Sequence, residues 1–124
     1  MEYRFVHLLS KEARKKIIEE ALSRRSLREL SETLGVSVAA ISKYKSGITH
    51  PSDETLARLL EVAEEEEARE YVRIMVEDLV SGISELISWA LERNLLDASV
   101  IAKVEKLHAK TLAAMTSRKR LSKM

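Results

Sequence analysis

Small, hydroxyl-bearing and basic side chains are concentrated in residues 35–47, GVSVAAISKYKSG, between two glycines. The stretch holds three serines, two adjacent alanines and two lysines, and its spacing predicts one short helix that Ser37 caps and Gly47 ends. The predicted outward face has no large side chain near its N-terminus. A helix that enters the major groove of DNA, which is only about 12 Å wide, benefits from such a face. The pattern therefore favours a helix that contacts DNA, and a simple packing helix is the alternative.

A second short helix is predicted just before residues 35–47. Its packing has to position the helix that would contact DNA. Ser26 and Glu29 form the S-x-x-E pattern of a capping box, and Gly35 ends the helix where the backbone requires a positive φ. The apolar residues of the pair that are expected to point inward are Leu30, Leu34, Val36, Ile41 and Tyr44. Together they would lock two short helices at a steep angle.

The segment SLRELSETLGVSVAAISKYKSG resembles the helix-turn-helix of Cro-like phage repressors and of the wider xenobiotic-response-element type of regulator. The following ITHPSDETLARLLEV resembles that family's next helix, where a Pro-Ser pair precedes a Leu-rich run. The resemblance covers roughly residues 11–63. Two positions depart from the family pattern, because Ser31 stands where the family usually has Ala and Lys45 where it often has Glu.

The resemblance implies double-stranded DNA as the partner and assigns a role to each matching position. The residues implied to face base edges are Ser37, Val38, Ala39, Ser42 and Lys43. The residues implied to contact phosphates are Arg24, Arg25, Ser26, Arg28, Lys45, Thr49 and His50. A serine hydroxyl can donate or accept at a base edge and a lysine can reach guanine O6 or N7, whereas helix N-termini and basic side chains hold phosphates.

Further helices are predicted around this pair. Ser10 begins one over Lys11–Arg24, and Ser52, directly after Pro51, begins another that presents a leucine face. The first nine residues, MEYRFVHLL, have a mixed period and fit either a strand or a docked arm. The run EEEE at 64–67 contains no helix breaker, so the preceding helix either continues through it or bends there.

The C-terminal half has the apolar spacing of a coiled coil. From Val72 onward apolar residues recur at steps of four and three, which is a heptad pattern on a helix predicted over 68–93. Asp97 begins a last helix, and residues 117–124 are expected to be a frayed basic tail. The predicted dimerisation residues are Val72, Val76, Leu79, Ile83, Leu86, Trp89 and Ala90. The alternative is a monomer in which these helices fold back on the N-terminal half.

Composition supports an all-α fold, since the 124 residues include only 3 Gly and 1 Pro. We expect a helix-turn-helix domain of four to five helices over 1–66, followed by a long helical hairpin over 67–124. There is no cysteine, and the three histidines lack metal-ligand spacing and a paired nucleophile, so no enzyme, cofactor or metal site is predicted. No apolar run approaches about 18 residues, which favours a cytoplasmic, nucleoid-associated protein without a membrane partner.

The net charge of +1 is unevenly distributed. Residues 1–50 carry +4, residues 51–97 carry −9 and residues 98–124 carry +6. Basic ends indicate a polyanionic partner, unless the acidic middle and the basic C-terminal part pair with each other. We interpret the chain as a sequence-specific regulator, a dimeric repressor that reads a pseudo-palindrome through residues 37–46. The alternatives are a helical adaptor protein, or DNA binding in an antitoxin, partition or recombination-accessory role, and an effector pocket between the C-terminal helices stays open.

Overall fold

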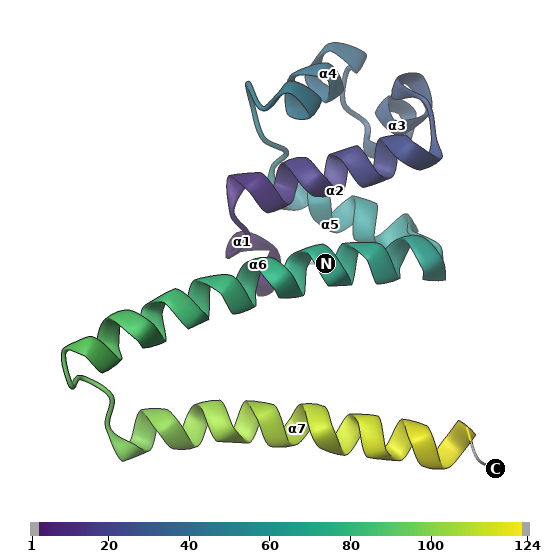
Figure 1. Cartoon of the computed structure of the whole chain (residues 1–124). Coiled ribbons are helices and arrows are strands. Elements are labelled where there is room, and N and C mark those ends of the chain that lie inside the picture. Colours follow the sequence, from purple (N-terminus) through teal and green to yellow (C-terminus); the bar gives the residue numbers. More distant parts are fainter. Residues whose placement is uncertain (1–2, 123–124) are drawn as a thin grey trace. The chain divides into compact units, whose positions relative to one another are not determined.

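The computed structural model describes residues 3–122, of which the side chains are described to Ser117. The helices of this part are α1 (Arg4–His7), α2 (Lys11–Arg24), α3 (Leu27–Leu34), α4 (Val38–Ser46), α5 (Asp53–Val62), α6 (Glu65–Glu92) and α7 (Ala98–Ser122) (Figure 1). No strand occurs between residues 3 and 122. The predicted all-α class, with a helix-turn-helix followed by long C-terminal helices, is therefore confirmed.

The chain divides into two compact units, Met1–Ile83 and Ser84–Met124. The sequence predicts a boundary after residue 66, which lies 17 residues before the one in the structure. The difference arises because the first turns of α6 belong to the core of the first unit. Tyr71 is completely buried there and Met75 is 6% exposed.

The core of the first unit forms around α2. Figure 1 shows α3 and α4 close together, and both helices contact α2. The buried apolar residues are Val6, Leu9, Ala13, Ile17, Ala21, Leu30, Leu34, Ile41, Leu56, Leu59, Tyr71 and Met75. All five side chains predicted to point inward are buried or half-buried in this core, so that prediction is confirmed. Each fully buried aliphatic side chain stabilises the fold by roughly 1.5–3 kcal/mol.

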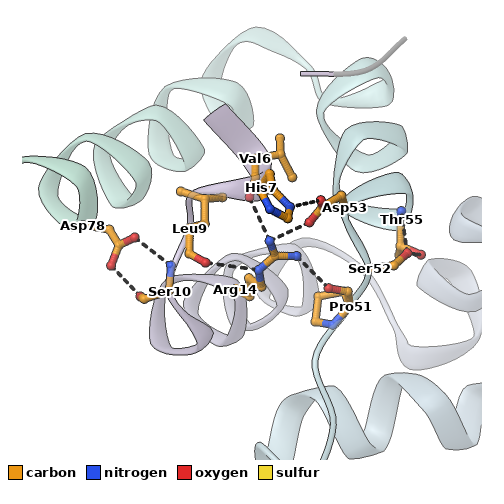
Figure 2. A network of polar contacts seen from close by, with 10 residues as sticks. All are labelled: Val6, His7, Leu9, Ser10, Arg14, Pro51, Ser52, Asp53, Thr55 and Asp78. Atoms are coloured by element: carbon orange, nitrogen blue, oxygen red, sulfur yellow. Dashed lines mark hydrogen bonds and ion pairs between the residues drawn. The ribbon is translucent and has the colours of Figure 1, made fainter. Parts of the chain in front are cut away.

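The N-terminal arm, for which the sequence left a strand and a docked segment open, is a short helix that packs on the first unit. Val6 of α1 is buried in the core, and the side chain of Arg14 donates to the backbone carbonyls of Val6, Leu9 and Pro51 (Figure 2). Arg14 Nη2 donates to the Val6 carbonyl at 2.8 Å, and its Nη1 donates to the Pro51 carbonyl at 3.0 Å. Arg14 thereby joins α1, α2 and the start of α5.

The break between α5 and α6 lies at residues 63–64, at the start of the acidic run. Ala63 has an extended backbone, with φ −67° and ψ 135°, and α6 begins at Glu65. Of the two possibilities that the sequence left open, the chain therefore bends at Ala63. Three glutamates lie in the first turn of α6, where the positive end of the helix dipole stabilises them.

In the second unit, a residue with left-handed backbone follows the end of α6, and α7 starts with a capped turn. Asn94 has φ 54°, and Leu95 N donates to the Ala90 carbonyl at 2.9 Å, as in a Schellman motif. Asp97 Oδ1 accepts from Val100 N at 2.9 Å, which confirms the predicted cap. Whereas a frayed tail is expected from Ser117, α7 is helical through Ser122, and residues 123–124 lie outside the described range.

Candidate nucleic-acid interface

Backbone and side-chain hydrogen bonds from α3 and α5 stabilise the turn between α3 and α4. Gly35 adopts φ 68°, and its N–H donates to the Ser31 carbonyl at 2.9 Å. The hydroxyl of Ser31 donates to the Val36 carbonyl, so the serine that replaces the family's alanine adds a bond across the turn. From α5, Arg58 Nη1 donates to the Leu34 carbonyl at 2.6 Å. The bonds to Ser31 and Leu34 satisfy carbonyls that the end of α3 would otherwise leave without a partner.

Both ends of α4 are capped as the sequence predicts. Ser37 Oγ accepts from Ala40 N at 3.0 Å, and at the other end Gly47 has φ 80°. Ile48 N donates to the Lys43 carbonyl at 3.0 Å, which completes a Schellman motif. The helix is therefore only nine residues long, and both of its ends are fixed by local hydrogen bonds.

The outward side of α4 presents the predicted base-reading residues. Ile41 is buried and Tyr44 is half-buried against the core, which turns the opposite side of the helix toward solvent. The residues exposed on α4 and at its cap include every member of the predicted set: Ser37, Val38, Ala39, Ser42 and Lys43. The structure thus brings small, hydroxyl and basic groups together on one accessible surface, which we call the α4 face.

The N-terminus of α3, where a phosphate contact is implied, carries a complete capping box. Ser26 Oγ accepts from Glu29 N at 3.1 Å, and Glu29 Oε1 accepts from Ser26 N at 3.2 Å. The hydrogen bonds from Ser26 lower the pKa of Glu29. Because both polar groups of Ser26 already serve the cap, an anion would meet the N–H groups of the first turn of α3, next to the exposed side chain of Arg28.

Two of the predicted phosphate ligands have partners inside the protein. Arg25 Nη2 lies 2.6 Å from Oε2 of Glu67, a carboxylate on α6 whose side chain is 4% exposed. The hydrogen bond to Glu67 raises the pKa of Arg25, so this cation is held in a structural pair. Arg24 Nη2 lies 3.1 Å from Glu20 Oε1 in an exposed pair that a phosphate can replace. We therefore remove Arg25 from the phosphate set and keep Arg24.

The remaining predicted phosphate ligands lie around the end of α4. Lys45 and Thr49 are exposed, whereas His50 is half-buried. The Nδ1 atom of His50 is buried and has no hydrogen-bond partner in the described part of the chain. His50 is therefore not exposed in the way that Lys45 and Thr49 are. Nothing in the structure explains why its Nδ1 atom is buried without a partner among the described residues.

The sequence analysis missed the arginines that hold the interface in place. Arg14 and Arg58 reach backbone carbonyls 37 and 24 residues away along the chain, at Pro51 and Leu34. Neither arginine belongs to a local motif, so residue spacing gives no signal for these contacts. Within residues 3–122, no group of three or more acidic or histidine side chains could hold a metal ion.

A cleft of about 830 Å³ lies between α1 and α5, in the first unit. Its lining combines acidic and basic groups from the two helices: Tyr3, Arg4, His7, Asp53, Glu54, Ala57, Arg58 and Glu61. This mixed lining does not single out one class of ligand. Its lining includes no residue of α6 or α7, the helices between which the sequence left an effector pocket open.

Comparison with known proteins agrees with this geometry. Residues 11–65 match the model of a protein family described as helix-turn-helix. No curated protein and no solved structure matches the chain significantly. None of the described helices is long and apolar enough to cross a membrane. The match lies in the N-terminal half of the chain, over the residues whose sequence resembles the Cro-like helix-turn-helix, and it supports a DNA-binding domain there.

Proposed function

We propose that the protein is a dimeric transcriptional repressor that reads a pseudo-palindromic DNA sequence through α4. The observation that supports the proposal is the α4 face, which is exposed, small at its N-terminus and basic at its end. In the major groove, Val38 would contact a thymine methyl group and Ser42 would donate or accept at a base edge. Lys43 would reach guanine O6 or N7. A repressor of this kind acts in the cytoplasm, at the nucleoid, by occluding a promoter.

A dimer is supported by apolar side chains that the chain leaves in contact with water. On α6 these exposed residues are Val72, Val76, Val80, Ile83, Leu86, Trp89 and Leu91. On α7 they are Val100, Ile101, Val104, Leu107, Leu112 and Met115. Apolar surface of this extent marks an interaction site, and a second copy of the chain is the simplest partner. Of the predicted dimerisation residues, Leu79 packs against the core of the first unit and Ala90 is buried, so we leave both out.

The first experiment is enrichment of duplex DNA from a random pool at about 150 mM salt, where non-specific binding is weak. We expect an inverted repeat whose halves lie about one helical turn, or about 34 Å, apart. Light scattering of the free protein should give twice the chain mass of 14.1 kDa. Recovery of no motif, with binding that vanishes at this salt, would contradict sequence-specific reading.

Two alanine variants separate base reading from phosphate binding. Lys43→Ala should change the preferred sequence and cost about 1–3 kcal/mol at the correct site. Arg28→Ala should weaken binding to all sequences about equally and reduce the salt slope by about one. Fluorescence titrations with the selected site and with a scrambled duplex measure both effects. If both variants act equally on every sequence, Lys43 does not read bases.

The exposed apolar side of α7 also favours a second candidate, an adaptor whose C-terminal helices bind another protein. The salt dependence of duplex binding discriminates between the two. A DNA-binding regulator with several phosphate contacts should give a log–log slope near about −0.9 for each contact. A slope near zero would favour the adaptor.

A further inference from the structure

The first turns of α6 are attached to the C-terminal end of α2 by a buried ion pair. Glu67 Oε2 accepts from Arg25 Nη2 at 2.6 Å, and its other oxygen accepts from the hydroxyl of Tyr71. Burial raises the pKa of Glu67, but the hydrogen bonds from Arg25 and Tyr71 outweigh this effect, so that its pKa is lowered and it stays ionised. Arg25 directly precedes Ser26, the cap of α3. The first anchor of α6 therefore lies beside the DNA-binding helices.

A second anchor holds α6 at the opposite end of α2. Asp78 Oδ2 accepts from the backbone N–H of Ser10 at 2.9 Å, and Asp78 Oδ1 accepts from the Ser10 hydroxyl at 2.5 Å (Figure 2). Ser10 is the cap of α2, and its Oγ also accepts from Ala13 N at 3.1 Å. One carboxylate thus binds α6 to the N-cap residue of α2 through two hydrogen bonds.

The stretch between the anchors is packed along its length. The two carboxylates are 11 residues apart on α6, which corresponds to about 16 Å of helix. Between them Tyr71 and Met75 are buried, and Ile74 packs against the same core. Turning α6 by one residue, or about 100°, would break both anchors and remove this apolar side from the core. The first turns of α6 therefore have one fixed orientation relative to α2.

We propose that Glu67 and Asp78 are positioning residues that determine which half-site separation the protein accepts. The inference rests on the proposed dimer, because α6 also carries the exposed residues expected to bind a second copy. Each base pair inserted between two half-sites moves them apart by about 3.4 Å and rotates them by about 35°. A helix-turn-helix domain that is fixed to α6 at two points cannot shift and rotate with its half-site. A domain that is loosely connected to α6 can.

The test varies the spacer between two copies of the selected half-site in steps of one base pair. The wild-type protein should prefer one spacing over its neighbours by about tenfold, or about 1.4 kcal/mol. In the double variant Glu67→Gln/Asp78→Asn, the preference should fall below about threefold. Affinity for a single half-site should stay within about twofold, because the α4 face is unchanged.

The chain offers a matched control at the two adjacent positions. Glu66 and Glu77 are exposed neighbours of the anchors on α6. The double variant Glu66→Gln/Glu77→Gln removes the same charge without touching the anchors, so it should keep the wild-type spacing preference. Thermal melting shows that each variant is folded. If the buried substitution prevents folding, Asp78→Asn alone must broaden the preference.

The outcomes separate this proposal from the function on which it rests. A folded anchor variant that keeps the wild-type spacing preference would overturn the role of Glu67 and Asp78 and leave the dimeric repressor intact. Equal broadening in the control variant would also overturn it, because charge and not attachment would then be the cause. If wild-type protein selects only isolated half-sites, the proposed dimer fails and this proposal fails with it.

Discussion

Gly35 is subject to two independent constraints. Its φ of 68° is a conformation that disfavours side chains, and a Cβ atom placed there would lie 3.0 Å from Arg58 Nη1. The same guanidinium donates to the Leu34 carbonyl, so it cannot move away without losing that bond. Gly82 differs in both respects, because it is helical and a Cβ atom there would meet nothing within 4 Å.

Substitution of these two glycines by alanine should therefore change stability in opposite directions. Gly35→Ala should lower the free energy of unfolding by at least about 1–2 kcal/mol, from backbone strain alone. Gly82→Ala should raise it by about 0.5–1 kcal/mol, because alanine is the better helix former. Urea unfolding of both variants at 25 °C measures the difference. A loss in both variants would mean that Gly82 has a contact that the structure does not give it.

Individual residues also mark the limit of what the sequence predicts. Ser26, Ser37 and Gly35 act within four residues of their own position, and their caps and turn could be predicted from spacing. Arg25 could not be assigned in this way, because its partner lies 42 residues away on α6. Basic residues next to a predicted DNA-binding helix suggest phosphate contacts by default, and only the fold distinguishes a structural cation from a free one.

At the scale of elements, the docking of α1 depends on one carboxylate at the start of α5. Asp53 Oδ1 lies 2.6 Å from Arg14 Nη2, and its Oδ2 lies 2.8 Å from His7 Nδ1. The hydrogen bond from Arg14, followed by that from His7, lowers the pKa of Asp53. The carboxyl group of Asp53 therefore binds its proton less tightly in the folded protein than in the unfolded chain.

This difference in pKa predicts a dependence of stability on pH. A lowered folded-state pKa contributes stability above the unfolded value of about 3.9, and this stability is lost as the pH falls through the folded-state value. Urea unfolding between pH 7 and pH 2.5 should therefore give a smaller acid loss for Asp53→Asn than for wild type. Glu54→Gln, one residue along α5, is the control and should keep the wild-type profile. Identical profiles for Asp53→Asn and wild type would contradict the assignment.

Elements that carry their own start and stop signals are the ones that the sequence predicts well. The starts of α2 to α5 follow from Ser caps, and the ends of α3 and α4 follow from left-handed glycines, all of which act locally. Which side of α6 packs on the core cannot be predicted from such local signals. Its heptad pattern singles out Val72 and Val76, yet the core takes Tyr71 and Met75. A wide apolar surface offers several possible faces, and the one that packs on the core lies between the anchors at Glu67 and Asp78.

At the scale of the whole molecule, the boundary at Ile83 has a direct experimental consequence. A fragment of residues 1–83 keeps both anchors and the buried Tyr71 and Met75 of α6, whereas a fragment of residues 1–66 loses them all. Removing Tyr71 and Met75 from the core takes away burial worth about 1.5–3 kcal/mol for each large apolar side chain.

The two fragments should therefore differ sharply in stability. Residues 1–83 should unfold cooperatively in urea, and residues 1–66 should unfold at a lower urea concentration or be largely unfolded at 25 °C. The fragment 1–83 with Tyr71→Ala should lie between them, because large-to-small core substitutions cost about 3–5 kcal/mol. Equal midpoints for 1–66 and 1–83 would place the boundary at the position that the sequence predicts.

The boundary of the first unit also predicts how a truncated form of the protein would act beside the full-length form. It holds the whole α4 face, but it ends before most of the apolar surface proposed to bind a second copy. A shortened product that stops near Ile83, made by nonsense mutation or by proteolysis, would occupy single half-sites without recruiting a second chain. If the protein is the dimeric repressor proposed above, this product would compete with the full-length protein for the same operator and relieve repression, so the truncated allele would be dominant.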